Sequence, residues 1–129
     1  MPTSINPSTV RPPFGTYSHG LVVDRPGRLL VTSGQLGTGL DDSVPEGVEA
    51  QAEMCFSNIA AILAEAGMRF DDVVRINAFV TRREHFAGYM AVRDRYIGDP
   101  PPASTLVIVS GFTRPEFLVE VEVTAVTSG

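Results

Sequence analysis

The sequence predicts an α+β fold, in which a mixed β-sheet carries two helices packed on one of its faces. Three observations point to it. The chain of 129 residues is 43% hydrophobic, which is enough to bury one sizeable core and no more. Its apolar residues follow helical spacing in two segments and alternate as in strands in several others. Strand-like segments occur in pairs towards both ends of the chain, which is typical of α+β sheets.

The beginning of the chain predicts an arm rather than a helix or a strand. Residues 1–13 are rich in proline and small polar residues, a composition that opposes both kinds of regular structure. We therefore expect an extended N-terminal arm over residues 1–13 and regular structure from about Phe14. The rest of the chain, residues 14–129, is expected to form a single domain.

The next segment predicts a hairpin. Two runs rich in valine and leucine lie at about 17–24 and 28–34. The stretch DRPG between them contains Pro26 and Gly27, which favour a turn. A loop rich in glycine, aspartate and proline follows at 35–47.

Two later segments predict helices. Apolar side chains recur every three or four residues from Val48 to Ala66, and Gly67 follows as a helix-ending glycine. Aromatic and apolar residues keep the same spacing within 83–98, which predicts a second, shorter helix. Prolines at 100–102 prevent its continuation.

Three further strands are predicted at 71–82, 103–111 and 117–126, which makes five strands in all. Two helices can cover only one face of such a sheet. The other face still carries valine, phenylalanine and leucine, so we expect another copy of the chain to cover it.

The bulk composition excludes several classes of partner and site. A formal net charge of −5 repels polyanions, so nucleic acid is not an expected partner. The single cysteine, Cys55, cannot form an internal disulfide, and no run of 18 apolar residues is present, so we expect a cytoplasmic protein without a membrane span. No metal site or cofactor is expected, because His19 and His85 lie on separate elements and Cys55 lies on a buried helix face.

Two small groups of polar residues are candidates for chemistry. Glu120 and Glu122 are two residues apart in the last strand and therefore project from the same sheet face. They are either the exposed side of an edge strand or a general acid/base at a subunit interface. Ser33 and His19 would meet across the predicted hairpin, although a serine beside a glycine is more often part of a turn.

The chain resembles the RidA/YjgF/UK114 (Rid) family of reactive-intermediate deaminases over about residues 13–126. Six segments carry the resemblance in one uninterrupted register: YSHG, VTSGQ, QAEMCFSNIAAILAEAG, DDVVRINAFVT, PPAST and VEVEVTAV. The resemblance implies a chorismate-mutase-like (YjgF-type) fold. It also implies a homotrimer that binds a small-molecule ligand in clefts between its subunits.

The resemblance further implies a set of site residues. In active members a glutamate on the last strand positions the water that hydrolyses an enamine or imine to a ketone and ammonia, and this glutamate falls on Glu120. The substrate-binding positions that match the family, or adjoin a matching one, are Tyr17, Ser33, Gly34, Ser104 and Thr105.

Two family positions differ in this chain. The arginine that binds the substrate carboxylate falls on Ala103, and an asparagine of the second helix falls on Met90. Ala103 has neither charge nor donor, so the chain is not expected to be a standard 2-imino acid deaminase. Arg93 and Arg95 on the preceding helix are the nearest cations in the sequence, and they are the candidates to replace the missing arginine.

Three functions remain open at this stage. The first is a hydrolase or deaminase of a small reactive imine or enamine, with Glu120 as the catalytic residue. The second is a small-ligand-binding or pathway-accessory protein on the same trimeric scaffold, without turnover. The third is the ribonuclease role that the family name endoribonuclease L-PSP carries, which the acidic charge disfavours.

Overall fold

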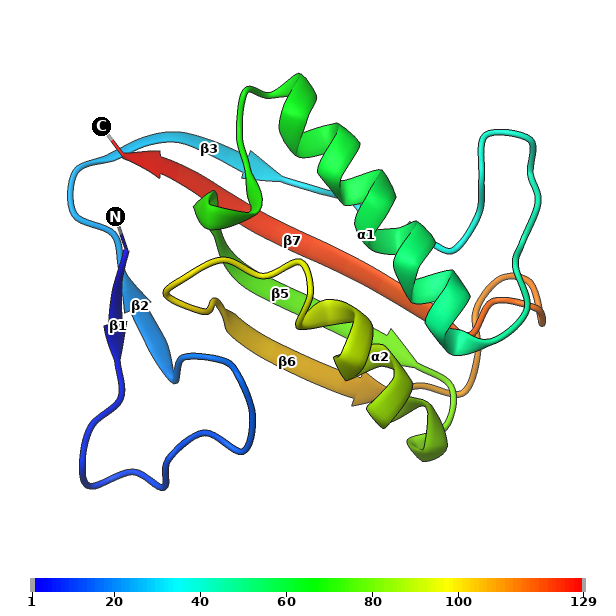
Figure 1. Ribbon diagram of the computed structural model, residues 1–129, viewed down its shortest axis with the longest axis horizontal. Coiled ribbons are helices and arrows are strands. Elements are labelled where there is room, and N and C mark those ends of the chain that lie inside the picture. The colour runs from blue at the N-terminus through cyan, green and yellow to red at the C-terminus, as the bar shows by residue number, and fades with distance from the viewer. Residues whose placement is uncertain (1, 129) are drawn as a thin grey trace.

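The computed structural model describes residues 2–128 and confirms the α+β fold, with both helices on one face of a mixed sheet (Figure 1). The sheet contains five strands: β3 (Pro26–Val31), β4 (Gln35–Leu36), β5 (Val73–Val80), β6 (Ala103–Ile108) and β7 (Val119–Ser128). The helices are α1 (Val48–Glu65) and α2 (Phe86–Arg93), and single 3-10 turns at Phe70–Asp72 and Arg83–His85 precede β5 and α2.

Strand β7 is the centre of this sheet. The strand order is β3-β7-β5-β6, and the short β4 also pairs with β7. Strands β5 and β6 are parallel, whereas β7 is antiparallel to each of its three partners. Because β7 is flanked on both sides, its alternating pattern does not belong to an edge strand.

The predicted hairpin does not form. The run at 17–24 contributes only β2 (Gly20–Val22), which pairs with β1 (Thr3–Ile5) in a separate two-stranded sheet, while β3 pairs with β7. The chain bends at Asp24 and Arg25, where Arg25 takes the left-handed conformation with φ 52°, and the expected turn residues Pro26 and Gly27 already belong to β3. The two strands diverge after it because β7 offers β3 a longer ladder than the three residues of β2.

The arm is more ordered than its composition predicted. Because Thr3–Ile5 form a strand, the prediction that regular structure begins near Phe14 is wrong. Hydrogen bonds of serine hydroxyls hold the arm against the domain. Ser4 Oγ lies 2.7 Å from Ser18 Oγ, and Ser18 Oγ donates to the carbonyl oxygen of Pro101 at 2.6 Å. Ser18 is buried, so this junction is part of the folded structure.

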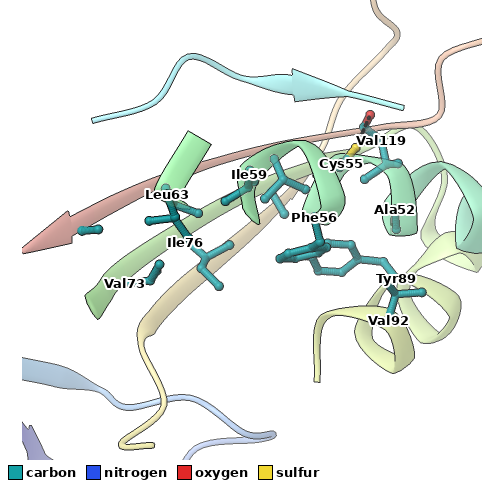
Figure 2. Close-up of a cluster of buried hydrophobic side chains, with 14 of the residues drawn as sticks. Ala52, Cys55, Phe56, Ile59, Leu63, Val73, Ile76, Tyr89, Val92 and Val119 are labelled. Carbon is teal, nitrogen blue, oxygen red and sulfur yellow. Dashed lines mark hydrogen bonds between the residues drawn. The ribbon is translucent and has the colours of Figure 1, made fainter. Parts of the chain in front are cut away.

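The core lies between the two helices and the sheet. The helix predicted from Val48 is confirmed as α1, and its buried face presents Cys55, Phe56 and Ile59 to the sheet (Figure 2). Each large apolar side chain buried in this way contributes about 1.5–3 kcal/mol. Helix α2 is shorter than predicted and adds Tyr89 and Val92 to the same cluster.

The sheet face turned away from the helices is called the open face below. It carries the residues that alternate with the buried ones of β5 and β7, among them Arg75, Asn77, Glu120 and Glu122. A register shift between Val73 and Arg75 turns Val73 towards the core, although strict alternation with Ile76 would place Val74 there.

The open face also exposes large apolar side chains. Leu29 and Val31 of β3 are both 66% exposed, and Val107 of β6 is 45% exposed. Among residues 2–128, no helix is long and apolar enough to cross a membrane.

Candidate functional site

Glu120 is a half-buried carboxylate on the open face. It lies opposite Leu36 of β4 on one side and Phe79 of β5 on the other. Within residues 2–128 its carboxylate accepts no hydrogen bond and forms no ion pair. Burial raises the pKa of this carboxyl above its ordinary value, and the neighbouring charge of Glu122 raises it further. A carboxylate in this state is suited to accept a proton from water.

Gly34 makes room for this carboxylate. A Cβ atom at Gly34 would lie 2.5 Å from Oε2 of Glu120 and 2.6 Å from its Cδ, so the two residues are in direct contact. Ser33 precedes this contact, and its carbonyl oxygen accepts a hydrogen bond from Nε2 of Gln35 at 3.2 Å. The sequence-predicted positions 33, 34 and 120 therefore lie together.

The beginning of β6 places three predicted residues on two different faces. Consecutive residues of a strand point to opposite sides, so Ala103 and Thr105 lie on the open face and Ser104 faces α2. Oγ1 of Thr105 accepts a hydrogen bond from Nη2 of Arg75 at 2.7 Å. Oγ of Ser104 accepts one from Nη1 of Arg93 at 3.0 Å.

Tyr17 and Ser104 lie in a cavity of about 500 Å³ between the arm, α2 and β6, which we call the arm pocket. Met90, at the position of the family's asparagine, also lines it, together with Phe14 and Tyr89. The hydroxyl of Tyr89 is buried and has no hydrogen-bond partner in the described part of the chain. The arm pocket is thus lined largely by apolar groups.

Neither cation that the sequence analysis considered is free to replace an arginine at 103. Arg93 is only 2% exposed and is neutralised by Asp94, with Nη2 2.8 Å from Oδ1. The same nitrogen donates to the carbonyl oxygen of Thr16. Arg95 forms an ion pair with Glu53 of α1, on the helical side of the molecule. The cation that does lie on the open face is Arg75.

The predicted pair of Ser33 and His19 is not formed. The hairpin that would have joined them is absent, and Nε2 of His19 lies 2.6 Å from the carbonyl oxygen of Arg11. Burial raises the pKa of the Cys55 thiol to about 12, so this cysteine is no nucleophile at neutral pH. No three His, Cys, Asp or Glu side chains come together as a metal site between residues 2 and 128.

The predicted site residues therefore form two groups in one chain. Ser33, Gly34 and Glu120, with Ala103 and Thr105, belong to the segments that make the open face, whereas Tyr17 and Ser104 lie in the arm pocket. Arg75 was not predicted from the sequence, because the cations considered there, Arg93 and Arg95, were those nearest to Ala103 along the chain. The sequence carries one part of the signal, the alternation of β5, which places Arg75 on the same face as Asn77; the parallel register that sets Arg75 opposite Ala103 is known only from the structure.

The comparisons with known proteins agree on one family. Residues 8–127 match the family model described as Endoribonuclease L-PSP. Protein DfrA of Myxococcus xanthus is 38% identical over 118 residues, which cover 88% of this chain and 87% of that protein. A 2-iminobutanoate/2-iminopropanoate deaminase of Dermatophagoides farinae is 28% identical over 100 residues, 76% of each protein.

A solved structure supports the same relationship. The Rid-family protein YyfB of Yersinia pestis superposes with a TM-score of 0.86 at 29% identity, and the match covers 98% of both chains. This likeness confirms the YjgF-type fold that the sequence resemblance implied.

Proposed function

The chain belongs to the endoribonuclease L-PSP (Rid) family, and from this membership we propose that it hydrolyses a small imine or enamine, with Glu120 as the catalytic base. The observation that carries the proposal is the carboxylate of Glu120, which is half-buried, has a raised pKa and has no hydrogen-bond or ion-pair partner among residues 2–128. The relative named as a 2-iminobutanoate/2-iminopropanoate deaminase supports the reaction class.

The reaction needs one base and one position for water. Glu120 accepts a proton from a water molecule as its oxygen attacks the carbon of the C=N bond, and a carbinolamine forms. Glu120 returns this proton to the nitrogen to complete the carbinolamine. It then takes the proton of the carbinolamine hydroxyl and delivers it to the amino nitrogen as the C–N bond breaks, so that the products are a ketone and ammonia. An enamine enters the same sequence after protonation on carbon. The raised pKa of Glu120 brings its proton affinity closer to that needed at both steps.

The remaining predicted residues would bind and orient the substrate. Main-chain groups of Ser33 and Gly34 lie beside the Glu120 carboxylate, and Thr105 contributes a hydroxyl to the open face. Ala103 leaves the family's own carboxylate-binding position without a cation. An imino acid is therefore not expected to bind in the arrangement that the resemblance implied.

We further propose a homotrimer with the substrate bound between subunits. Tyr17 and Ser104 occupy the arm pocket on the helical side of β6, away from the open face that carries Glu120. One small substrate would reach both groups only if each came from a different copy of the chain. The exposed apolar side chains of Leu29 and Val31 give such a copy a surface to cover.

A pair of isosteric substitutions tests the role of Glu120. Glu120→Gln is expected to lower kcat on a freshly generated imine by about 10²–10⁴-fold, because the amide cannot accept the proton. Glu122→Gln is the matched control on the same face and should change kcat less than threefold at neutral pH. Full activity of Glu120→Gln, with Glu122→Gln impaired, would assign the base elsewhere.

The alternative is a small-ligand-binding or accessory protein on the same scaffold. It is favoured by the apolar residues Ala103 and Met90 at two positions that the resemblance expects to be polar. Binding of a ketone or imine analogue by the unmodified protein, with no turnover of any imine in a panel, would support this alternative against the hydrolase.

A further inference from the structure

Helix α1 carries two amide side chains that point towards the strands around Glu120. Gln51 and Asn58 are seven residues apart, about two helical turns, so they lie on the same side of α1. The helix itself lies across β7, the strand that carries Glu120 (Figure 1). Gln51 is only 2% exposed, and Asn58 is half-buried. A buried amide is unfavourable unless it is hydrogen-bonded, so its partners show what it does.

Gln51 holds the segment immediately before β7. Its Nε2 donates to the carbonyl oxygen of Glu116 at 2.9 Å and to that of Pro45 at 3.0 Å. Its Oε1 accepts a hydrogen bond from the backbone nitrogen of Leu118 at 2.9 Å. The residue after Leu118 begins β7, and Glu120 is the next. One amide therefore fixes the main chain where it enters the strand of the proposed base.

Asn58 holds the end of β4. Its Nδ2 donates to the carbonyl oxygen of Thr38 at 3.2 Å and to that of Leu36 at 3.4 Å. Strand β4 consists of Gln35 and Leu36 alone, which is shorter than an ordinary strand. Leu36 is the residue directly opposite Glu120. Asn58 thus adds side-chain hydrogen bonds to a strand that its own short ladder holds weakly.

The segment 34–37 connects α1 to the carboxylate by direct contact at both of its ends. A Cβ atom at Gly37 would lie 2.6 Å from Cβ of Gln51 and 2.8 Å from its Cα, so the chain after β4 is packed closely against α1. At the other end, Gly34 contacts the carboxyl group of Glu120. A shift of this segment away from α1 would therefore move the atoms that limit the position of the carboxylate.

We propose that Gln51 and Asn58 are positioning residues of the hydrolase: they hold the start of β7 and the end of β4, so that Gly34 keeps the Glu120 carboxylate in its half-buried place. The proposal rests on the proposed function, in which Glu120 is the base. The hydrogen bonds of both amides go to the main chain and not to the carboxylate, so both residues act through the segments that they hold.

Apolar substitutions of similar size test the two amides. Gln51→Met and Asn58→Leu remove the hydrogen bonds and keep most of the volume. Each is expected to lower kcat on a freshly generated imine at least tenfold and to leave KM within about threefold, because proton transfer by a displaced base is impaired in the transition state.

Leu63→Ala is the control for lost stability. It shortens a buried side chain in the last turn of α1 and should lower the melting temperature at least as much as either amide variant, while changing kcat less than threefold. Losses of kcat in the amide variants no larger than in this control would overturn the proposal. Thermal unfolding of each variant shows whether the fold is kept, and Asn58→Ala replaces Asn58→Leu if the larger side chain prevents folding.

A double-mutant cycle tests the route through Gly34. Gly34→Ala is itself expected to displace the Glu120 carboxyl, because the added Cβ would lie 2.5 Å from Oε2. Asn58→Leu should therefore lower kcat at least tenfold alone but less than threefold when Gly34→Ala is already present. Full additivity of the two losses would overturn the proposed route.

Titration of Glu120 separates this proposal from the proposed function. NMR of the side-chain carboxyl follows its pKa without turnover. In Gln51→Met and Asn58→Leu this pKa is expected to fall towards its ordinary value, because a displaced carboxyl loses part of the burial that raises it. In Leu63→Ala it should stay as in the unmodified protein.

The two ideas can then fail independently. If Glu120→Gln keeps full activity but the amide variants still lower the pKa of Glu120, the proposed function fails and the positioning role stands. If hydrolysis depends on Glu120 and the amide variants change neither kcat nor the pKa of Glu120 beyond the control, the positioning role fails alone.

Discussion

Gly34→Ala is the substitution that most directly tests the position of the Glu120 carboxylate. The added Cβ would lie 2.5 Å from Oε2, 2.6 Å from Cδ and 2.9 Å from Cγ of Glu120. Ordinary van der Waals contact requires roughly 3.5 Å, so the carboxyl group has to move by about 1 Å. The backbone at Gly34 does not need a positive φ, and the effect is therefore steric rather than conformational.

A displacement of this size has a predictable cost for catalysis. Misplacing a reacting group by about 1 Å lowers the rate by about 10²-fold, so kcat of Gly34→Ala is expected to fall by that factor. The fold should lose only about 1 kcal/mol, because the atoms that must move are the end of a flexible side chain. A carboxyl pushed towards solvent also loses part of the burial that raises its pKa, so the acid limb of kcat against pH should move to lower pH.

The assay is steady-state hydrolysis of a freshly generated imine from about pH 4 to about pH 8. Thermal unfolding of each variant is measured beside it. Gly111→Ala is the control, because a Cβ there would meet no atom within 4 Å. An unchanged kcat together with an unchanged acid limb in Gly34→Ala would refute the reasoning. A large loss of stability would show that the backbone, and not the Glu120 side chain, yields.

Three further outcomes are expected. Glu120→Gln should raise the melting temperature slightly at pH 7, by about 1–2 °C. Burial raises the pKa of Glu120 in the folded protein, so ionisation of this carboxyl lowers the stability as the pH rises through that pKa. The difference in melting temperature between the variant and the unmodified protein should vanish well below pH 4.5, where Glu120 is protonated in both the folded and the unfolded chain. Sedimentation equilibrium should give three chains per particle, and Val31→Lys should reduce that number, because Val31 is 66% exposed on the open face; one chain per particle for the unmodified protein would contradict both the trimer and the shared cleft. Cys55 should resist alkylation in the folded protein and react after unfolding, since burial raises its pKa to about 12, and rapid reaction under native conditions would show that α1 opens.

Local periodicity was sufficient for much of the fold. The apolar residues of α1 recur at helical spacing from Ala52 to Leu63, and the strands around Ile76 and Val121 alternate clearly. The hairpin was mispredicted for the opposite reason. A turn signal such as DRPG acts locally, whereas the choice of β7 over β2 as partner of β3 depends on a ladder formed with the far end of the chain.

In the candidate site, too, local spacing predicted some features, whereas contacts between distant segments could not be predicted. Glu120 and Glu122 were assigned to one face from their spacing, and the structure places them so. The neighbours of Glu120 were beyond the reach of spacing, since its contact with Gly34 joins two strands that are distant in the sequence. Arg75 was overlooked because parallel pairing, which sets it opposite Ala103, carries no local sequence signal.

The central place of β7 has a consequence for how the protein is made. Leu30 pairs with Ala125, so β3 leaves the ribosome long before its partner strand exists. Until β7 arrives, the sheet can consist only of the parallel pair β5 and β6, and such distant pairings are slow to form. The strand that closes the sheet also carries Glu120. A nascent or incompletely folded chain therefore holds no hydrolytic carboxylate in position, and the proposed activity would begin only when folding is complete.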